Sequence, residues 1–538
     1  MKSNSVPITE KSNPKSKNID MLKAEDISKI LSDCDDEIFS GYKGLMGVYD
    51  KKLVRKCTLF SKKIQSKIYK NEKVNIIFVG AGTSGRLCRL MAKVLIPIVK
   101  DKINIIPIIA GGIKALVRAE PNTEDKIEEG IFDYLSHTKN IDRSNCFVIG
   151  VSCGLSANYV RGALEEANKY SSGKTAIIGF NPIELATVDF GKKTQVLNPN
   201  IGPEPIVGSV RMKGGTTTMI LIYSLILSSM RASQQIKNLL INALGDSKDA
   251  LSRIRNYQDI VAQLINLGNK ALQSGGSIYL LGSSSYGALC IYDAAECPPT
   301  FGAKIDQVNG YSQNGVSDLV YFSGEKEEKM AKEIDLNVFR EETLPNLTEK
   351  DMVLIIRNSK ENTKEIIKVI NSQFKNLYSI QVTQKGEKLN ESEKNDDMIF
   401  EEDWKNHFQR LLFIRNLLVQ FSTGSFVLSG KVYENKMIDL RITNKKLFLR
   451  TIRIINQITH KNENDIKEAL LRIIHGGCIS SQNSLEDTIA LSASKENIVP
   501  LTILSLVYPG KSMKELRLVL SKEPIVRKLI IEELANLK

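Results

Sequence analysis

The chain has few of the residues that build covalent or metal-bound frameworks. It contains 8 cysteines, 4 histidines and 1 tryptophan among 538 residues. No two cysteines form a Cys-x-x-Cys pair, and the histidines lie far apart in the sequence. Neither a disulfide framework nor a zinc or other metal site is therefore expected. We interpret the thiols as reduced and mostly buried, because free cysteine behaves as a small hydrophobic residue.

Long hydrophobic runs and secretory signals are also missing. The most apolar stretch, Met219 to Leu227, is too short and too interrupted to cross a bilayer. This predicts a cytoplasmic protein without a membrane partner. The net charge is +13, but the lysines alternate with acids and no RNA-recognition pattern occurs, so no nucleic acid partner is expected. The excess positive charge fits anionic ligands or an acidic partner.

The length implies two or three folded units. We predict a polar leader at 1–19, a first domain with N-terminal helices at 20–270, a second domain at 271–443 and a helical unit at 444–538. Apolar runs that alternate with glycine-rich turns and amphipathic stretches predict parallel sheets covered by helices. Strands are predicted in the first domain at 74–79, 103–109, 146–151, 175–180 and 194–198.

The second domain repeats this pattern. Strands are predicted at 278–281, 352–356 and 378–382, and the turn Gly282 to Gly287 parallels the turn Gly80 to Gly85. Residues 234–273 are predicted to be helical, and 384–403 are expected to form a mobile polar insertion. The predicted fold class is α/β: two parallel sheets flanked by helices, of the flavodoxin type, and an all-helical C-terminal domain.

The loop FVGAGTSGRL follows the first predicted strand and carries Gly80, Gly82 and Gly85 in a G-x-G-x-x-G pattern. A dinucleotide site needs an acidic residue at the end of the second strand, but that strand ends in IAGG at 109–112. We therefore expect no dinucleotide and no other cofactor. Thr83 and Ser84 instead place hydroxyls at a helix start, where free N–H groups and the helix dipole favour an anion.

A second turn, VSCGLSAN from Val151, repeats this chemistry with Ser152, Gly154 and Ser156. Two such loops at the carboxyl ends of adjacent parallel strands predict one crevice that suits a phosphate group. The alternative is that these hydroxyls only cap their helices.

Longer motifs resemble known families. GAGTSGRL, IAGG, the TED at 123–125, VGSVRMKGGT at 207–216 and DAAECPPTFG at 293–302 resemble the sugar isomerase (SIS) domains of N-acetylmuramic acid 6-phosphate etherase. The doubled domain, with VPITEKSNP at 6–14, VSCGLSA at 151–157 and LRITNKKLFLR at 440–450, resembles the glucokinase regulatory protein family over nearly the whole chain. The resemblance implies two SIS domains with a helical lid, and fructose 6-phosphate or fructose 1-phosphate bound between them. It also implies glucokinase, of the hexokinase family, as the inhibited partner, and a place in the cytoplasm and the nucleus.

The resemblance also implies the ligand-binding residues. The family's sugar-phosphate contacts fall on Thr83, Ser84, Glu124, Ser152, Cys153, Gly154, Glu296 and Lys446. Hydroxyls and amides would hold the phosphate, the carboxylates would accept hydrogen bonds from sugar hydroxyls, and the ammonium would close over the anion. The alternatives are that the carboxylates are helix-cap or surface acids, and that Lys446 faces solvent beside Lys445.

Etherase chemistry requires two acid/base carboxylates. The first domain keeps Glu124 but has Val94 at the helix position of the other acid, while the second domain has Glu296 and no TED-like turn. We therefore expect no catalytic residues and a non-catalytic regulator. An etherase-like lyase is the alternative if Glu124 and Glu296 converge across the domain boundary. A phosphosugar isomerase is a third hypothesis, for which the sequence positions no histidine or lysine as base.

Overall fold

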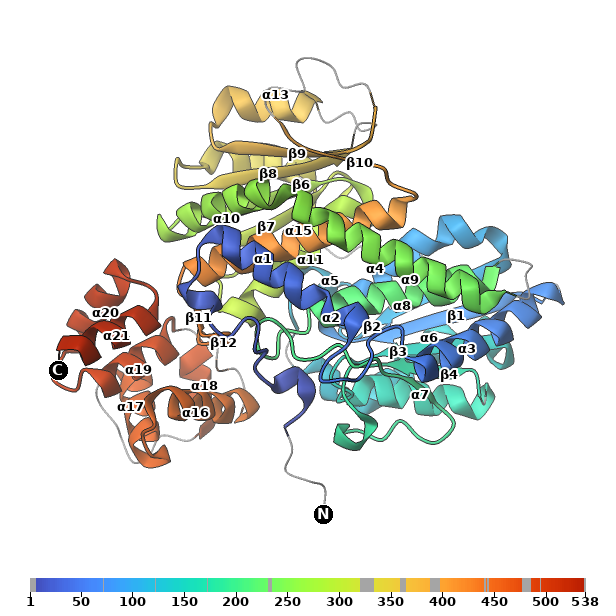
Figure 1. Ribbon diagram of the computed structural model, residues 1–538, viewed down its shortest axis with the longest axis horizontal. Helices are drawn as coiled ribbons and strands as arrows, with labels where there is room; N and C mark the ends of the chain where they lie inside the picture. Colours follow the sequence, from blue (N-terminus) through green and yellow to red (C-terminus); the bar gives the residue numbers. More distant parts are fainter. Residues whose placement is uncertain are drawn as a thin grey trace.

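A computed structural model describes residues 6–70, 72–120, 122–171, 173–230, 235–319, 333–358, 364–387, 397–439, 442, 445–476, 485–493 and 495–536. It contains two five-stranded parallel sheets flanked by helices and a C-terminal helical domain that lies beside them (Figure 1). This is the predicted fold class.

The first sheet has the strand order β2-β1-β3-β4-β5, and every neighbouring pair is parallel. β1, which lies between β2 and β3, is buried along its whole length, which explains the apolar run in the sequence. All five predicted strands are confirmed. Their bounds are β1 Val74–Gly80, β2 Ile103–Ile109, β3 Cys146–Val151, β4 Thr175–Ile178 and β5 Gln195–Leu197.

The second sheet has the order β10-β9-β8-β6-β7 and is also parallel. Its strands are β6 Ile278–Gly282, β7 Val308–Ser312, β8 Met352–Asn358, β9 Leu377–Gln384 and β10 Asp397–Glu402. In both sheets the first strand lies between the second and the third, so the duplication is confirmed. In such sheets, ligands bind at the carboxyl ends of the strands where the strand order reverses.

Two strands of the second sheet were not predicted. β7 is an edge strand with the sequence VNGYS, whose polar and glycine residues hide the strand pattern. β10 lies within 384–403, so the prediction of a mobile insertion is wrong for this part: it pairs with β9 and buries Phe400. Residues 388–396 of the same segment lie outside the described residues.

Helices cover both sheets and build the C-terminal domain. In the first domain these are α1 Ala24–Asp35, α2 Glu37–Ser40, α3 Lys51–Tyr69, α4 Gly82–Val99, α5 Lys114–Val117, α6 Ile127–His137, α7 Asn158–Tyr170, α8 Lys213–Met230 and α9 Ile236–Ser252. In the second domain they are α10 Gln258–Gln273, α11 Ser284–Phe301, α12 Leu336–Val338, α13 Lys364–Gln373 and α15 His407–Leu428. The hairpin β11 Val432–Tyr433 and β12 Lys436–Met437 leads to α16 Lys445–Thr459, α17 Glu463–His475, α18 Leu485–Ala493, α19 Ile498–Val507, α20 Met513–Lys522 and α21 Val526–Asn536.

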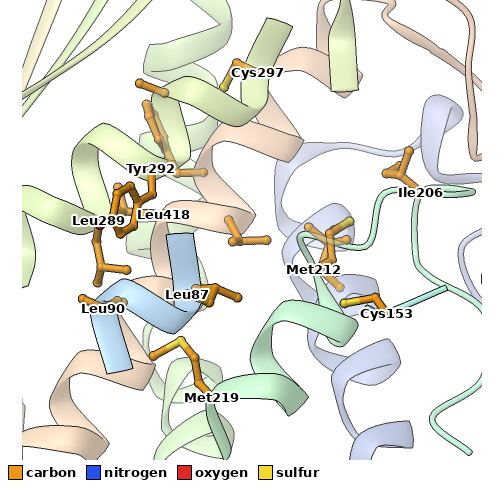
Figure 2. Packing of buried hydrophobic residues seen from close by; sticks show 14 of the residues in the cluster. Leu87, Leu90, Cys153, Ile206, Met212, Met219, Leu289, Tyr292, Cys297 and Leu418 are labelled. Atoms are coloured by element: carbon orange, nitrogen blue, oxygen red, sulfur yellow. The ribbon is translucent and has the colours of Figure 1, made fainter. Parts of the chain in front are cut away.

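Helices α4 and α11 pack against each other across the boundary between the two α/β domains, and α15 packs against α11. Figure 2 shows Leu87 on α4 near Leu289 and Tyr292 on α11 and Leu418 on α15. All four side chains are buried. Helix α15 is long and apolar enough to cross a membrane by composition, but 94% of its most apolar window is buried inside the protein. It is a core helix that joins the two domains.

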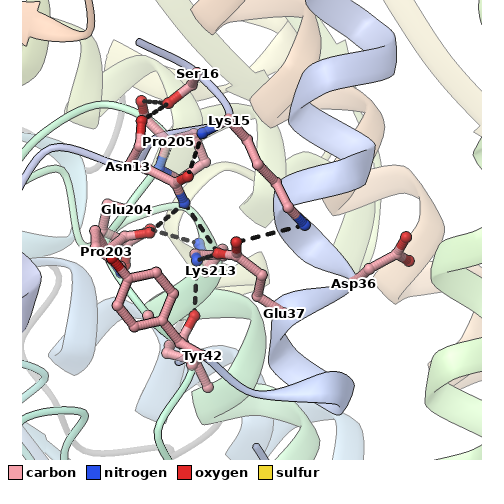
Figure 3. Close-up of polar contacts among 12 residues, drawn as sticks. Asn13, Lys15, Ser16, Asp36, Glu37, Tyr42, Pro203, Glu204, Pro205 and Lys213 are labelled. Atoms are coloured by element: carbon pink, nitrogen blue, oxygen red, sulfur yellow. Dashed lines mark hydrogen bonds and ion pairs between the residues drawn. The ribbon is translucent and has the colours of Figure 1, made fainter. Parts of the chain in front are cut away.

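The leader packs onto the first domain (Figure 3). Asn13 is fully buried, and its side-chain amide donates to Glu37 Oε2 and to the Pro203 carbonyl, both at 2.9 Å. The Ser16 hydroxyl donates to the Pro205 carbonyl at 2.6 Å. Polar residues of the leader therefore hold it against the segment that precedes α8.

A buried lysine stands at the start of α8. The Lys213 side chain is 0% exposed; its ammonium forms an ion pair with Glu37 and donates to the Ile201 carbonyl at 2.7 Å. The Glu204 carboxylate accepts the backbone N–H groups of Lys213 at 2.9 Å and of Gly214 at 2.8 Å. A carboxylate thus satisfies the otherwise unpaired amides at the N-terminus of α8.

Burial in this network raises the pKa of Glu204 and that of Asp35 to about 7, although the Lys213 ammonium opposes both shifts. Each carboxyl therefore binds a proton more tightly in the folded chain than in the unfolded chain. Their contribution to stability is complete below about pH 4 and is lost as the pH rises through about 7.

Urea denaturation should show that Asp35→Asn/Glu204→Gln loses less stability than the wild type between pH 5.5 and pH 7.5. An unchanged pH difference in this variant would contradict the assignment, and the exposed Glu463→Gln is the control.

Candidate functional site

The first candidate loop joins β1 to α4 at the carboxyl end of the sheet. A Cβ on Gly80 would lie 2.6 Å from the amide nitrogen of Gly85, so only glycine allows the turn this tight. The residue before the helix, Ala81, provides no side-chain cap. Thr83 and Ser84 make other contacts, so the capping alternative is wrong for this loop.

The second candidate loop lies against the first one. The Ser84 hydroxyl is 3.6 Å from the Cys153 sulfur. The loops that follow β1 and β3 therefore lie side by side, as predicted. The Ser152 hydroxyl accepts the backbone N–H groups of Ser156 at 3.0 Å and Ala157 at 3.1 Å. Ser152 therefore binds backbone amides of its own loop, as the capping alternative proposes. The Gly154 carbonyl accepts a hydrogen bond from the Asn181 side chain at 3.0 Å.

Glu296 crosses the boundary between the two domains. It stands on α11 of the second domain, and its Oε1 accepts from the Thr83 hydroxyl at 2.6 Å and from Arg86 Nη1 at 2.5 Å. The residue is 9% exposed, so the alternative of a surface acid is wrong. The second domain thus supplies a carboxylate to the loop of the first domain.

Arg86 was not predicted as a site residue, although it lies in the GTSGRL motif. It is 2% exposed, and besides Glu296 it donates from Nε to the Leu116 carbonyl at 3.2 Å. Its partner belongs to another domain, so no local pattern in the sequence indicated the contact. Arg86 thus pairs with Glu296 at the point where Glu296 also accepts from the Thr83 hydroxyl.

A second buried network also crosses the boundary between the two domains. Arg211 donates to Asp293 Oδ1 at 2.8 Å and to the Thr423 hydroxyl at 2.8 Å, while Arg415 donates to the Thr216 hydroxyl at 2.6 Å and to the Arg211 carbonyl. Burial raises the pKa of Asp293, which Arg211 opposes, and burial lowers the pKa of Arg415 to about 10. The VRMKGGT motif thus forms part of the domain boundary.

A small cavity of about 30 Å³ lies at this boundary. It is lined by Thr83, Arg86, Leu87, Arg211, Leu289, Tyr292, Asp293, Glu296, Arg415, Leu418 and Val419. Such a volume suits one or two water molecules and is too small for a sugar phosphate. A larger ligand must therefore lie over the two loops or separate the domains.

The remaining predicted residues are placed as follows. Glu124 is exposed in a short helical turn, Thr123–Asp125, whose Thr123 lies close to Gly111 at the end of β2. It is therefore on the same edge of the sheet as the two loops. Lys446 belongs to the first turn of α16, and its side chain lies outside the described residues. Val94, at the position of the missing acid, is buried on α4.

The matching loop of the second domain is occupied by its own chain. The Asp318 carboxylate accepts the Ser284 amide at 3.1 Å, the Asn314 amide at 3.2 Å and the Ser312 hydroxyl. Lys93 reaches it from α4 of the first domain, with Nζ 3.2 Å from Asp318 Oδ1. Although burial opposes it, the hydrogen bond from Ser312 and the charge of Lys93 lower the pKa of Asp318. An internal carboxylate thus accepts a backbone amide of this loop, whereas Glu296 at the first loop accepts from the Thr83 side chain.

The leader and the C-terminal domain meet near the two loops. Thr9 exchanges hydrogen bonds with Asn181, whose side chain also binds the Gly154 carbonyl. Arg450 of α16 donates to the Val207 carbonyl at 3.1 Å and lies 3.3 Å from Glu10. A chain of contacts therefore connects α16 with the leader and, through Thr9 and Asn181, with the second loop.

Three family models match successive parts of the chain. They describe the glucokinase regulatory protein N-terminal SIS domain at residues 59–168, its second SIS domain at 256–429 and its C-terminal lid domain at 434–530. The glucokinase regulatory protein of Homo sapiens is 29% identical over 558 residues, which cover 94% of this chain and 88% of that protein. The one from Xenopus laevis is 27% identical over 94% of this chain and 89% of that protein. The N-acetylmuramic acid 6-phosphate etherase of Staphylococcus epidermidis is 35% identical over 37% of this chain and 67% of the enzyme.

Proposed function

Because the chain belongs to the glucokinase regulatory protein family, we propose that it is a cytoplasmic, and also nuclear, regulator that responds to a fructose phosphate. In this proposal it binds fructose 6-phosphate or fructose 1-phosphate between its SIS domains. In response it binds and inhibits a glucokinase-type hexokinase.

The observation that carries the proposal is the contact of Thr83 with Glu296, at 2.6 Å. The loop that is suited to a phosphate belongs to the first SIS domain, and the carboxylate that is suited to sugar hydroxyls belongs to the second. One phosphosugar that used both groups would have to span the two domains. Its affinity would then depend on how the domains are arranged.

This dependence supplies the regulatory mechanism. The phosphate would accept hydrogen bonds from the first-turn amides of α4 and from Ser84, while a sugar hydroxyl would donate to Glu296 in place of Thr83. A ligand changes a conformational equilibrium only by the difference between its affinities for the two states. Bound sugar would therefore favour one arrangement of the SIS domains, and the surface for glucokinase would be presented in only one of them.

Calorimetry with both fructose phosphates, with free fructose as the control without phosphate, tests the ligand. Ser84→Ala and Glu124→Ala should each weaken binding by about 1 to 3 kcal/mol, the usual range for removing one partner of a buried polar contact, because the bound sugar phosphate would cover both side chains, including the exposed Glu124. Unchanged affinity in both variants would disprove the site. A glucokinase assay with and without each ester then tests inhibition and shows which ester acts and in which direction.

The second candidate function is an etherase-like lyase. The observation in its favour is that Glu296 reaches the loop of the first domain, so a carboxylate of one domain does serve the other. Against it, Arg86 holds Glu296 as an ion-paired carboxylate, and the other acid position is the aliphatic Val94. Release of lactate from N-acetylmuramic acid 6-phosphate would establish the lyase and exclude a pure sensor.

A further inference from the structure

A second, larger cavity lies between the second SIS domain and the helical lid. Its volume is about 580 Å³, and small-molecule sites usually occupy roughly 300 to 1,000 Å³. The ends of α10 and α15 form one wall, and α19, α20 and Pro524 form the other. None of its lining residues belongs to the fructose phosphate site proposed above.

The cavity carries positive charge. Its lining includes Lys431, Arg517 and Lys522 and contains no carboxylate. Lys431 forms an ion pair with Asp439. Arg517 and Lys522 are exposed on α20, and no ion pair to either occurs among the residues that the structure describes.

The nearest acids in the sequence do not neutralise these two cations. Glu515, two residues before Arg517, accepts hydrogen bonds from the Ser512 amide and hydroxyl, both at 2.7 Å. Glu496, which precedes the lining residue Asn497, pairs with Lys304 at 3.4 Å. Glu523, which follows Lys522, pairs with Lys528 at 3.3 Å. The mouth of the cavity therefore attracts an anion.

The rest of the lining is mixed: half of the other twelve residues are apolar, and Gln273, Gln307, Ser429, Asn497 and Ser521 are polar. The apolar residues are Leu272, Phe426, Pro500, Leu501, Leu520 and Pro524. The Phe426 ring stacks on Phe301, with ring centroids 4.8 Å apart and an interplanar angle of 14°. Because this ring is fully buried, the half-buried Leu520 and Pro524 provide the apolar surface that a ligand can reach, and this surface favours a ligand with a flat or aliphatic body over a simple inorganic ion.

We propose that this cavity binds a small organic anion, a phosphate or carboxylate attached to an apolar body. The acidic group lies against Arg517 and Lys522, and the body lies against the half-buried Leu520 and Pro524. Such a ligand contacts both domains and holds α19 and α20 against the second SIS domain. Because α16 of the same lid contacts the first SIS domain through Arg450, the ligand is linked energetically to the arrangement of the whole molecule.

The test uses 1-naphthyl phosphate and calorimetry on the full chain, with and without saturating fructose 6-phosphate. Binding of 1-naphthyl phosphate that persists in saturating fructose 6-phosphate must occur outside the proposed fructose phosphate site. If fructose 6-phosphate itself does not bind, the titration of 1-naphthyl phosphate alone still tests this proposal. Inorganic phosphate provides the charge without the body, and 1-naphthol provides the body without the charge. Arg517→Gln/Lys522→Gln removes the cations, Ser521→Trp fills the cavity, and Lys511→Gln/Lys514→Gln is a control with the same change of net charge on or beside α20.

We expect 1-naphthyl phosphate to saturate one site in both conditions, and both comparison compounds to bind at least about tenfold more weakly. Arg517→Gln/Lys522→Gln and Ser521→Trp should each weaken binding of 1-naphthyl phosphate about tenfold or more, while the control double variant leaves it unchanged. Absence of saturable binding would overturn the proposal. So would equal binding of inorganic phosphate, or affinities that neither test variant changes.

Discussion

Replacing Glu296 by glutamine should weaken binding of the fructose phosphate by roughly 10- to 100-fold, because a charge-assisted hydrogen bond to a sugar hydroxyl is lost. The same change leaves the Arg86 guanidinium buried without its counter-ion. Removing one partner of a buried ion pair destabilises a protein by about 3 kcal/mol or more. The thermal midpoint should therefore fall by several degrees, measured by calorimetry alongside the binding titration.

Glu468→Gln is the matched control for this change. Glu468 pairs with Arg472 at 2.7 Å, but both side chains are mostly exposed. Exposed ion pairs contribute about 1 kcal/mol or less, so this variant should retain the stability and the affinity of the wild type. A Glu296→Gln protein that melts and binds like the wild type would show that the cross-domain contact has no role.

Replacing Lys213 by methionine should give the largest loss of stability, about 3 to 5 kcal/mol. The ammonium is fully buried, and its removal leaves the Glu37 carboxylate with Asn13 and Lys15 as its partners among the residues that the structure describes. The start of α8 would then lose its link to α2 and to the leader. Denaturation by urea, followed by circular dichroism, measures the effect.

A double-mutant cycle separates the ion pair from packing. Lys213→Met/Glu37→Met removes both charges, and replacing both partners of a buried pair by apolar groups is often nearly neutral. The double variant should therefore be more stable than Lys213→Met alone. Lys467→Met, which breaks an exposed pair with Glu463, should have little effect. A single variant as stable as the wild type would contradict the role of Lys213.

Much of the fold could be predicted from local pattern. β1 is buried on both faces and therefore reads as an apolar run, and the glycine-rich turn after it marks the carboxyl end of the sheet. The adjacency of Ser84 and Cys153 followed from the parallel order of β1 and β3. β7 and β10 were missed because polar residues interrupt the strand pattern in β7 and surround it near β10.

The contacts between domains could not be predicted in the same way. Arg86, Arg211 and Asp293 all lie in motifs that the sequence made visible, but the oppositely charged residues with which they pair are 82 or more residues away. Which side chains meet there depends on how the two sheets dock, and this is set by the packing of α4, α11 and α15. The role of Ser152 as an acceptor for two backbone amides depends equally on the exact path of its loop.

Two SIS domains could bind two sugar phosphates only if the matching loops of both domains were free to accept one. In the second SIS domain the Asp318 carboxylate already accepts from the Ser284 amide and pairs with the Lys93 ammonium. A second sugar phosphate would therefore have to displace a carboxylate that belongs to the chain itself. Saturation at a single equivalent of ester per polypeptide is the expected stoichiometry. The two SIS domains therefore have the same arrangement of strands but differ in what lies at the loop after the first strand.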